Sequence, residues 1–243
     1  MKKIFLISFI FSAVAFSQTL IPKLPQITAS SFLLIDAETN KIIAQQNPEA
    51  STGLASITKI MTSYIVADYL KQGFLNIKDS TTVSEKCWRM EGSRMFIQEG
   101  KKVLIEDLMR GMIIQSGNDA ACALAEHIAG TQEDFASLMN DYAQKMELKN
   151  TNFTNPTGLP NVNHYSTAED IAKLSIVLIN DFPDEYAIYS EKEFTYNDIR
   201  QLNRNSLLWQ DDSIDGIKTG HTRASGYCLV ASSKRADMRL ISI

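Results

Sequence analysis

Strand-like sequence lies near both ends of this chain, and helical sequence fills the region between them. A β-hairpin is predicted near the N-terminus from SFLLIDAETNKIIAQ, where Glu38, Thr39 and Asn40 supply the turn. Two neighbouring strands are predicted near the C-terminus from SGYCLVASS and MRLISI. Because strands from both ends can share one sheet, we expect an α+β domain with helices packed on the faces of that sheet.

Apolar residues recur at helical spacing through the middle of the chain. The predicted helices span residues 54–70, 105–114, 119–130, 132–146 and 167–181. The first of these should be central, because its apolar residues include Ile57, Ile60 and Met61 on the packed side. Ser166 and Glu169 have the spacing of a capping box for the last helix.

Length and composition favour one large globular domain. The chain has 243 residues, of which 44% are hydrophobic and 21% are charged, enough to bury one substantial core. The net charge of −4 gives no positive footprint for nucleic acid, and no basic block suggests binding to acidic lipid. The substrate is therefore not collected by bulk positive charge.

The first 17 residues have the order of a secretory signal peptide. Lys2 and Lys3 precede an apolar run from residue 4 to residue 16, and small residues lie at or just after its end, at Ala13, Ala15 and Ser17. The run is short for a membrane span, so a signal anchor is the weaker alternative. We expect residues 1–17 to be removed on export across the cytoplasmic membrane, and residues 18–243 to form the mature domain.

The cysteines and histidines give no metal signature. Cys87, Cys122 and Cys228 are an odd set without metal-ligand spacing, and we interpret all three as core or free thiols. The three histidines are scattered along the sequence. We therefore predict neither a metal site nor a cofactor.

One short motif introduces possible chemistry. Ser56 and Lys59 lie three residues apart at the start of the predicted 54–70 helix, so both side chains fall on one helix face. A lysine that loses its proton could activate the serine as a nucleophile. Taken alone, the pair is equally compatible with a helix-capping serine and a solvated lysine.

Two further motifs follow in order. Ser116 and Asn118 lie between two predicted helices, where a glycine stop and an Asn cap would also explain them. Lys218, Thr219 and Gly220 come just before the predicted strand pair. The motifs Ser-x-x-Lys, Ser-x-Asn and Lys-Thr-Gly are thus separated by 60 and 102 residues. This combination is the set shared by penicillin-binding proteins and serine β-lactamases.

The chain resembles the low-molecular-mass penicillin-binding proteins, the serine-type D-alanyl-D-alanine carboxypeptidases of peptidase family S11. The resemblance covers nearly all of the mature sequence, in the blocks ASITKIMT, SRMFIQEG, LMRGMIIQSGNDAA, NPTGLP, HYSTAEDIA and DGIKTGHT. It implies a β-lactamase/transpeptidase-like fold. In that fold a helical cluster packs against an antiparallel sheet, and the active site lies in the cleft between them.

The chemistry and the resemblance together assign roles to particular residues. Ser56 is the expected nucleophile and Lys59 its base, provided that burial and a second cation, Lys218, lower the pKa of Lys59. The resemblance implies that Ser116 relays a proton and that the backbone N–H groups of Ser56 and His221 form an oxyanion hole. The substrate-binding residues that it implies are Asn118, Lys218, Thr219, Gly220, His221 and Thr222.

The resemblance also implies a substrate and a location. It implies removal of the terminal D-alanine from peptidoglycan stem peptides ending in D-Ala-D-Ala, and covalent binding of β-lactam antibiotics. Both would take place in the periplasm or at the outer face of the inner membrane. The family usually continues to an arginine near the substrate carboxylate, a β-rich domain and an amphipathic C-terminal helix. This sequence has none of them, so we expect a C-terminally truncated chain, with membrane association only through that absent region.

Two alternatives remain open. A serine β-lactamase shares the three motifs, but the Glu-x-x-Leu-Asn segment that commonly holds its hydrolytic water is not found between residues 118 and 218. A non-catalytic peptidoglycan-binding protein could keep an inherited cleft. The presence of both Ser56 and Lys59 argues against a protein without catalytic activity.

Overall fold

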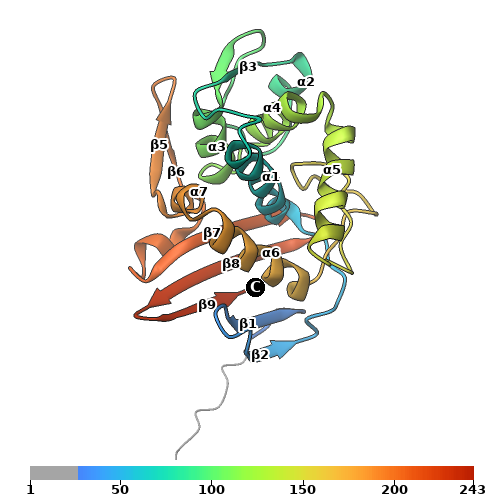
Figure 1. Cartoon of the computed structure of the whole chain (residues 1–243), viewed down its shortest axis with the longest axis vertical. Helices are drawn as coiled ribbons and strands as arrows, with labels where there is room; N and C mark the ends of the chain where they lie inside the picture. Colours follow the sequence, from blue (N-terminus) through green and yellow to red (C-terminus); the bar gives the residue numbers. More distant parts are fainter. Residues whose placement is uncertain (1–26) are drawn as a thin grey trace, which may run out of the picture.

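The computed structural model describes residues 27–243, which form a helical cluster packed on a five-stranded sheet (Figure 1). The predicted signal peptide, residues 1–17, lies outside the described residues. Within residues 27–243, no helix combines the length and the apolar character needed to cross a lipid bilayer. The two layers correspond to the predicted α+β architecture.

The sheet is antiparallel and is built from both ends of the described chain, as predicted. Its strand order is β2-β1-β9-β8-β7, so the N-terminal hairpin pairs with a strand from the far end of the sequence. Leu34 lies opposite Ser242, for example. The strands are β2 (Ile42–Gln46), β1 (Phe32–Asp36), β9 (Met238–Ser242), β8 (Gly226–Arg235) and β7 (Ile214–Thr222).

The central helix is α1 (Lys59–Lys71), which contacts four other long helices. Ile60, Met61 and Ile65 are completely buried in it, because α1 is covered on all sides. Helix α6 contacts α1 on one side and strands β1 and β9 on the other, so it links the two layers (Figure 1). The helices around α1 are α3 (Ile105–Ile113), α4 (Asn118–Ala129), α5 (Gln132–Lys145) and α6 (Ala168–Asp181).

The predicted capping box of α6 is wrong by one residue. Thr167 is the N-cap, and its hydroxyl accepts a hydrogen bond from the backbone N–H of Asp170. Ser166 instead pairs as an isolated β-bridge with Thr52, and its hydroxyl contacts that of Thr151. The extended bridge at Ser166 delays the start of the helix, which the sequence spacing alone does not reveal.

Several short elements connect the long ones. Each has only three or four residues, too few for a hydrophobic period to be recognised in the sequence. They are β3 (Ser80–Thr82), β4 (Lys102–Leu104), β5 (Glu193–Tyr196), β6 (Ile199–Leu202), α2 (Glu85–Trp88), α7 (Pro183–Tyr186) and the 3-10 helices η1 (Ala55–Thr58), η2 (Ala187–Ser190) and η3 (Ser206–Trp209).

The interpretation of all three cysteines as thiols is wrong for two of them. Cys87 on α2 and Cys122 on α4 form a disulfide, and Cys228 remains a free thiol. The two bonded residues are 35 positions apart in the sequence, but packing of α2 on α4 brings their Cα atoms to 5.3 Å. An oxidising compartment, as expected for an exported chain, favours such a bond.

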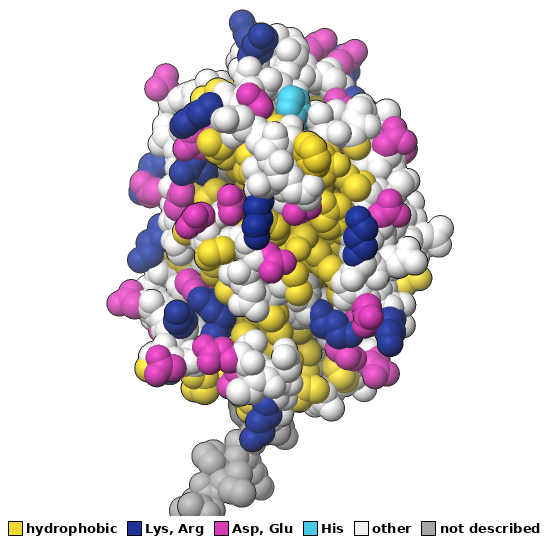
Figure 2. Space-filling model, viewed as in Figure 1, with side chains coloured by type: hydrophobic (Ala, Val, Ile, Leu, Met, Phe, Trp, Pro, Cys, Tyr) yellow, Lys and Arg dark blue, Asp and Glu magenta, His cyan; other side chains and the backbone are white. Residues whose placement is uncertain are grey.

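The surface carries charges of both signs. On the face shown in Figure 2, acidic and basic side chains are interspersed around a central band of hydrophobic side chains. No field of one sign covers this face. The distribution agrees with the modest net charge of −4 and with the expectation that bulk charge does not recruit the substrate.

Candidate active site

Ser56 and Lys59 lie at the junction of η1 and α1. Ser56 Oγ and Lys59 Nζ are 3.0 Å apart, which is hydrogen-bond distance. Lys59 is only 1% exposed, whereas Ser56 is partly exposed. A ligand can therefore reach the serine hydroxyl while the amine beside it is shielded from water.

Two further acceptors orient the Lys59 amine. Its Nζ lies 2.7 Å from Asn118 Oδ1 and 2.7 Å from the carbonyl oxygen of Thr157. Amide and carbonyl oxygens can only accept, so they take the two N–H bonds of a neutral amine. The remaining lone pair then faces Ser56 Oγ. This arrangement suits a general base that removes the serine proton.

The electrostatics of the site favour the neutral form of Lys59. Burial lowers the pKa of its amine well below the ordinary value, and the positive charge of Lys218 lowers it further. The carboxylate of Asp119 has the opposite, smaller effect. Both causes expected from the sequence, burial and a second cation, are thus present in the structure.

The Ser116–Asn118 motif lies in the connection between α3 and α4. Ser116 has a left-handed backbone conformation (φ 65°), and its hydroxyl accepts a hydrogen bond from Lys218 Nζ at 2.8 Å. The side-chain amide of Asn118 accepts from Lys59 and donates to the carbonyl oxygen of Glu91. Asn118 therefore joins Lys59 to the loop between α2 and β4, and both ends of its amide have protein partners.

Lys218, Thr219 and Gly220 come before the predicted strand pair β8 and β9, as expected, and they lie within a further strand, β7, which the sequence did not predict. Lys218 is 1% exposed, and burial together with the charge of Arg204 lowers the pKa of its amine to about 7. Gly220 packs against the nucleophile: a Cβ atom there would lie 3.0 Å from the backbone nitrogen of Ser56. The third motif thus borders the first one directly.

The last two predicted residues are placed differently from each other. His221 is exposed, and its ring lies on that of Tyr227 with centroids 4.2 Å apart. The hydroxyl of Thr222 donates to Ser225 Oγ and accepts from the N–H of Ser225. Thr222 therefore holds the turn between β7 and β8.

A cleft of about 580 Å³ connects the three motifs. It lies between the helical cluster and the edge of the sheet, because β7 is the outermost strand. The motif residues that line it are Ser56, Ser116, Thr219, Gly220 and His221. Lys59, Asn118 and Lys218 lie beneath this surface, bonded to one another or to the lining serines. The structure thus gathers residues from three distant parts of the sequence at one cleft.

Comparison with known proteins identifies the family. The family model described as D-alanyl-D-alanine carboxypeptidase, peptidase S11, matches residues 18–243. The chain belongs to this peptidase S11 family. The expected β-lactamase/transpeptidase-like fold is confirmed by penicillin binding protein 5 from Haemophilus influenzae, with a TM-score of 0.88 and 48% identity. That match covers 91% of this chain and 66% of the solved chain.

Two relatives carry the family name. D-alanyl-D-alanine carboxypeptidase DacA of Haemophilus influenzae is 48% identical over 224 residues, which cover 90% of this chain and 57% of the relative. D-alanyl-D-alanine carboxypeptidase DacC of Escherichia coli K12 is 46% identical over 242 residues, covering 97% of this chain and 60% of the relative. The chain thus spans somewhat more than half the length of these S11 relatives.

Three residues of the candidate site lie outside the three sequence motifs. Arg204 and Ser93 line the cleft, and Arg204 contributes to the lowered pKa of Lys218. The buried carboxylate of Asp119 accepts hydrogen bonds from the backbone N–H groups of residues 95–97, which fixes the loop that carries Ser93. In the sequence, the only indication of this role of Asp119 is that a charged residue directly follows Asn118.

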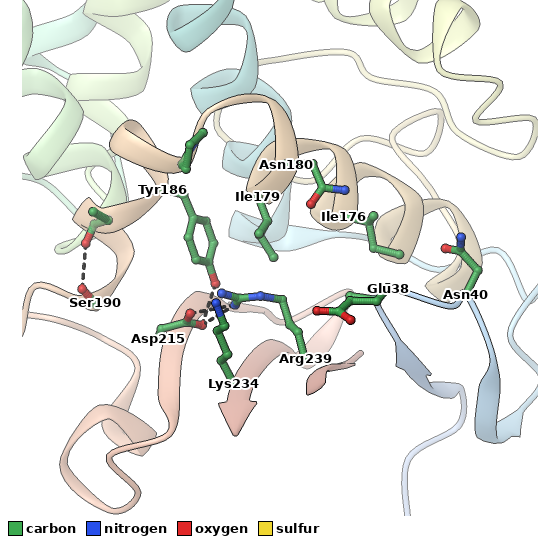
Figure 3. Close-up of a pocket in the computed structure, with 13 residues that line it drawn as sticks. Glu38, Asn40, Ile176, Ile179, Asn180, Tyr186, Ser190, Asp215, Lys234 and Arg239 are labelled. Atoms are coloured by element: carbon green, nitrogen blue, oxygen red, sulfur yellow. Dashed lines mark hydrogen bonds and ion pairs between the residues drawn. The ribbon is translucent and has the colours of Figure 1, made fainter. Parts of the chain in front are cut away.

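A larger cavity, of about 780 Å³, lies at the other end of β7, between α6, α7 and the sheet (Figure 3). Two of its side chains meet at Asp215, which accepts from the Tyr186 hydroxyl at 2.9 Å and pairs with Arg239 at 2.7 Å. None of its lining residues belongs to the three motifs. This network ties α7 to strands β7 and β9, and so supports the strand that carries Lys218.

Proposed function

We propose that the chain is a serine-type D-alanyl-D-alanine carboxypeptidase that removes the terminal D-alanine from peptidoglycan stem pentapeptides. The observation that carries the proposal is the 3.0 Å contact between Ser56 Oγ and a buried Lys59 whose amine is held by two other acceptors. The names of the S11 relatives support the same activity. β-Lactams would acylate the same serine.

In the first step, Lys59 accepts the proton of the Ser56 hydroxyl while Ser56 Oγ attacks the carbonyl carbon of the penultimate D-alanine. The carbonyl electron pair moves to its oxygen, which the N–H groups of Ser56 and His221 stabilise. Gly220 supports this geometry, because it lets β7 approach the backbone nitrogen of Ser56. One tetrahedral intermediate forms, with its negative charge on that oxygen.

In the second step, the peptide C–N bond breaks and the amine of D-alanine takes up a proton. Ser116 can deliver that proton, because its hydroxyl oxygen accepts from Lys218 Nζ at 2.8 Å and can be reprotonated by this amine. A pKa of Lys218 near 7 suits a group that both gives and regains a proton. Water then attacks the carbonyl carbon of the Ser56 ester and gives a proton through Ser116 to the neutral Lys218 amine. As the ester C–O bond breaks, Lys59 returns its proton to Ser56 Oγ, which restores the free enzyme.

The free edge of β7 offers a place for an extended peptide. β7 is the last strand in the sheet order, so a substrate can add along it as a further strand. Thr219 and Arg204 line the cleft beside the buried Lys218, which makes this end suitable for a C-terminal carboxylate. Thr222 contributes by shaping the turn that follows.

The proposed substrate and location agree with an exported chain. Peptidoglycan stem peptides lie outside the cytoplasmic membrane, and residues 1–17 have the pattern of a signal peptide. We therefore place the enzyme in the periplasm or at the outer face of the inner membrane. The chemistry above needs no cofactor and no metal, and the net charge gives no basis for a nucleic-acid partner.

Mass spectrometry after incubation with penicillin tests the acyl-enzyme. We expect a covalent adduct on Ser56 in the wild type and no adduct in Ser56→Ala, whose turnover of a peptide substrate should fall by about 10⁶-fold. The adduct lifetime separates the alternatives, since a serine β-lactamase would turn over rapidly. An intact wild-type protein that forms no adduct would instead support a non-catalytic peptidoglycan-binding protein.

Paired substrates test the carboxylate pocket. We expect D-alanine release from a stem pentapeptide to exceed cleavage of its C-terminally amidated form by roughly 10- to 150-fold, because the amide removes a charge-assisted contact. The measurement is the rate of product formation by chromatography. Equal rates would favour an endopeptidase over a carboxypeptidase.

A further inference from the structure

The backbone immediately before the nucleophile has an unfavourable conformation. Ala55 has φ 46°, in the left-handed region that costs free energy for a residue with a side chain. Its carbonyl oxygen accepts a hydrogen bond from Thr58 Oγ1 at 2.8 Å. A contact of this kind is needed to hold the turn, because Ser56 takes its position directly from Ala55.

A buried histidine stands behind this contact. His164 Nε2 lies 2.7 Å from Thr58 Oγ1, and His164 Nδ1 lies 3.0 Å from the backbone nitrogen of Thr154. A backbone N–H can only donate, so Nδ1 is an acceptor and the imidazole proton is on Nε2. The one hydroxyl hydrogen of Thr58 goes to Ala55, so Thr58 Oγ1 accepts from Nε2. The direction of each bond in the chain Thr154–His164–Thr58–Ala55 is thereby fixed.

The surroundings of His164 keep its imidazole neutral, so the directions of these hydrogen bonds do not change. The imidazole is 5% exposed, and burial lowers its pKa to about 4, so it stays neutral over the range in which the enzyme would work. The loop that leads to His164 also contacts the Ala55 carbonyl, through Gly158. A Cβ atom on Gly158 would lie 1.8 Å from that oxygen, so only glycine permits this approach.

We propose that His164 is a positioning residue for the nucleophile: through Thr58 it fixes the Ala55–Ser56 turn in the geometry that acylation requires. The proposal rests on the proposed acyl-enzyme function. The imidazole forms hydrogen bonds to Thr58 and Thr154, so His164 acts on the reacting atoms indirectly, through Thr58. Its loss should slow bond formation at Ser56 more than it weakens the initial non-covalent binding of a β-lactam.

Two amide substitutions separate the two ring nitrogens. His164→Gln can keep a donor near Nε2 and loses the acceptor at Nδ1, whereas His164→Asn can keep an acceptor near Nδ1 and loses the donor to Thr58. We expect the acylation rate constant for a fluorescent penicillin to fall roughly 10- to 100-fold in His164→Asn. In His164→Gln it should stay within about threefold of the wild type. The non-covalent binding constant, from the same stopped-flow series, should change less than about twofold in both.

A second pair of variants keeps the test decisive if His164→Asn does not fold. Thr58→Ser retains the hydroxyl and Thr58→Val removes it, and we expect only the valine variant to lose acylation rate. Where both single variants fold, the double variant Thr58→Val/His164→Asn should be acylated no more slowly than the slower single variant. The reason is that both substitutions remove the same hydrogen bond between His164 and Thr58.

The outcomes distinguish this proposal from the one on which it rests. A wild-type protein that is not acylated would overturn both. A wild-type protein that is acylated, with equal rates in His164→Asn and His164→Gln, would overturn only the role of His164. Wild-type acylation rates in Thr58→Val would do the same.

Discussion

Lys59 has three hydrogen-bonding neighbours, and only Ser56 among them can give up a proton. Asn118 and Thr157 each occupy one N–H bond of the amine, which leaves the nitrogen lone pair for the serine hydroxyl. In the proposed mechanism, Lys59 therefore acts as a neutral base whose lone pair is oriented by its other two hydrogen bonds. A residue that is always charged cannot replace it.

Substitution of Lys59 by arginine should test this point. We expect Lys59→Arg to be nearly as slow in penicillin acylation as Lys59→Ala, because the guanidinium stays protonated at any accessible pH. The measurement is the acylation rate constant of both variants by intact mass. Retention of more than about a tenth of the wild-type rate in Lys59→Arg, a barrier change of about 1.4 kcal/mol, would mean that another group is the base.

At the scale of elements, two glycines with similar backbone angles provide a matched comparison. Gly158 (φ 84°) packs on the Ala55 carbonyl, whereas a Cβ atom on Gly130 (φ 82°), at the end of α4, would meet no other atom within 4 Å. We expect Gly130→Ala to cost about 1 kcal/mol of unfolding free energy, from backbone strain alone. Gly158→Ala should cost at least about 2 kcal/mol more, and urea unfolding measures both. Equal losses of unfolding free energy in the two variants would show that Gly158 is not in close contact with the Ala55 carbonyl.

The disulfide joins α2 to the helix that follows the Ser116–Asn118 motif. Closing a loop with a sequence separation of 35 removes conformational entropy from the unfolded chain, worth about 3 to 4 kcal/mol at 25 °C. We expect the Cys87→Ala/Cys122→Ala variant to lose about that much stability in urea unfolding. Adding a reductant should destabilise the wild type and leave the variant unchanged. A variant as stable as the oxidised wild type would contradict this expectation.

The long elements and the motif residues could be predicted from sequence because both leave local patterns. The 105–113 and 132–145 helices show clear apolar periodicity, and the hairpin turn at Glu38–Asn40 has a local turn signal. The disulfide and the His164–Thr58 contact could not be predicted, because each joins residues that only tertiary packing brings together. The same limit applies to Arg204, which reaches the cleft from a loop without a motif.

At the scale of the whole molecule, Lys218 should make stability depend on pH. Its pKa is about 7 in the folded chain and near 10.5 when unfolded, so between these values the unfolded state binds more protons. Burial of its charge therefore destabilises the fold below pH 7, and this cost is relieved as the pH rises. The unfolding free energy should rise by at most about 1.4 kcal/mol per pH unit from this one group.

Comparison with Lys218→Met isolates this contribution. We expect the unfolding free energy of the wild type, relative to Lys218→Met, to increase between pH 7 and pH 9.5. Loss of the Lys218 charge also raises the pKa of Lys59 in the variant, which acts in the same direction. Urea unfolding of both proteins at several pH values provides the measurement. A difference that stays constant with pH would show that the pKa of Lys218 in the folded chain is the same as in the unfolded chain.

Pairing of β1 with β9 also has a consequence for how the chain is made. Leu34 needs Ser242 as its neighbour, and a ribosome that adds about 5 to 20 residues per second takes roughly 10 to 40 seconds to travel between them. Until β9 emerges, the β1 edge of the β1–β2 hairpin is unpaired. On the other strand of the hairpin, Ile42 and Ile43 stay exposed even in the finished protein. For the proposed export, this interval would favour passage of an unfolded chain, because the sheet cannot close before its two distant strands have both been synthesised.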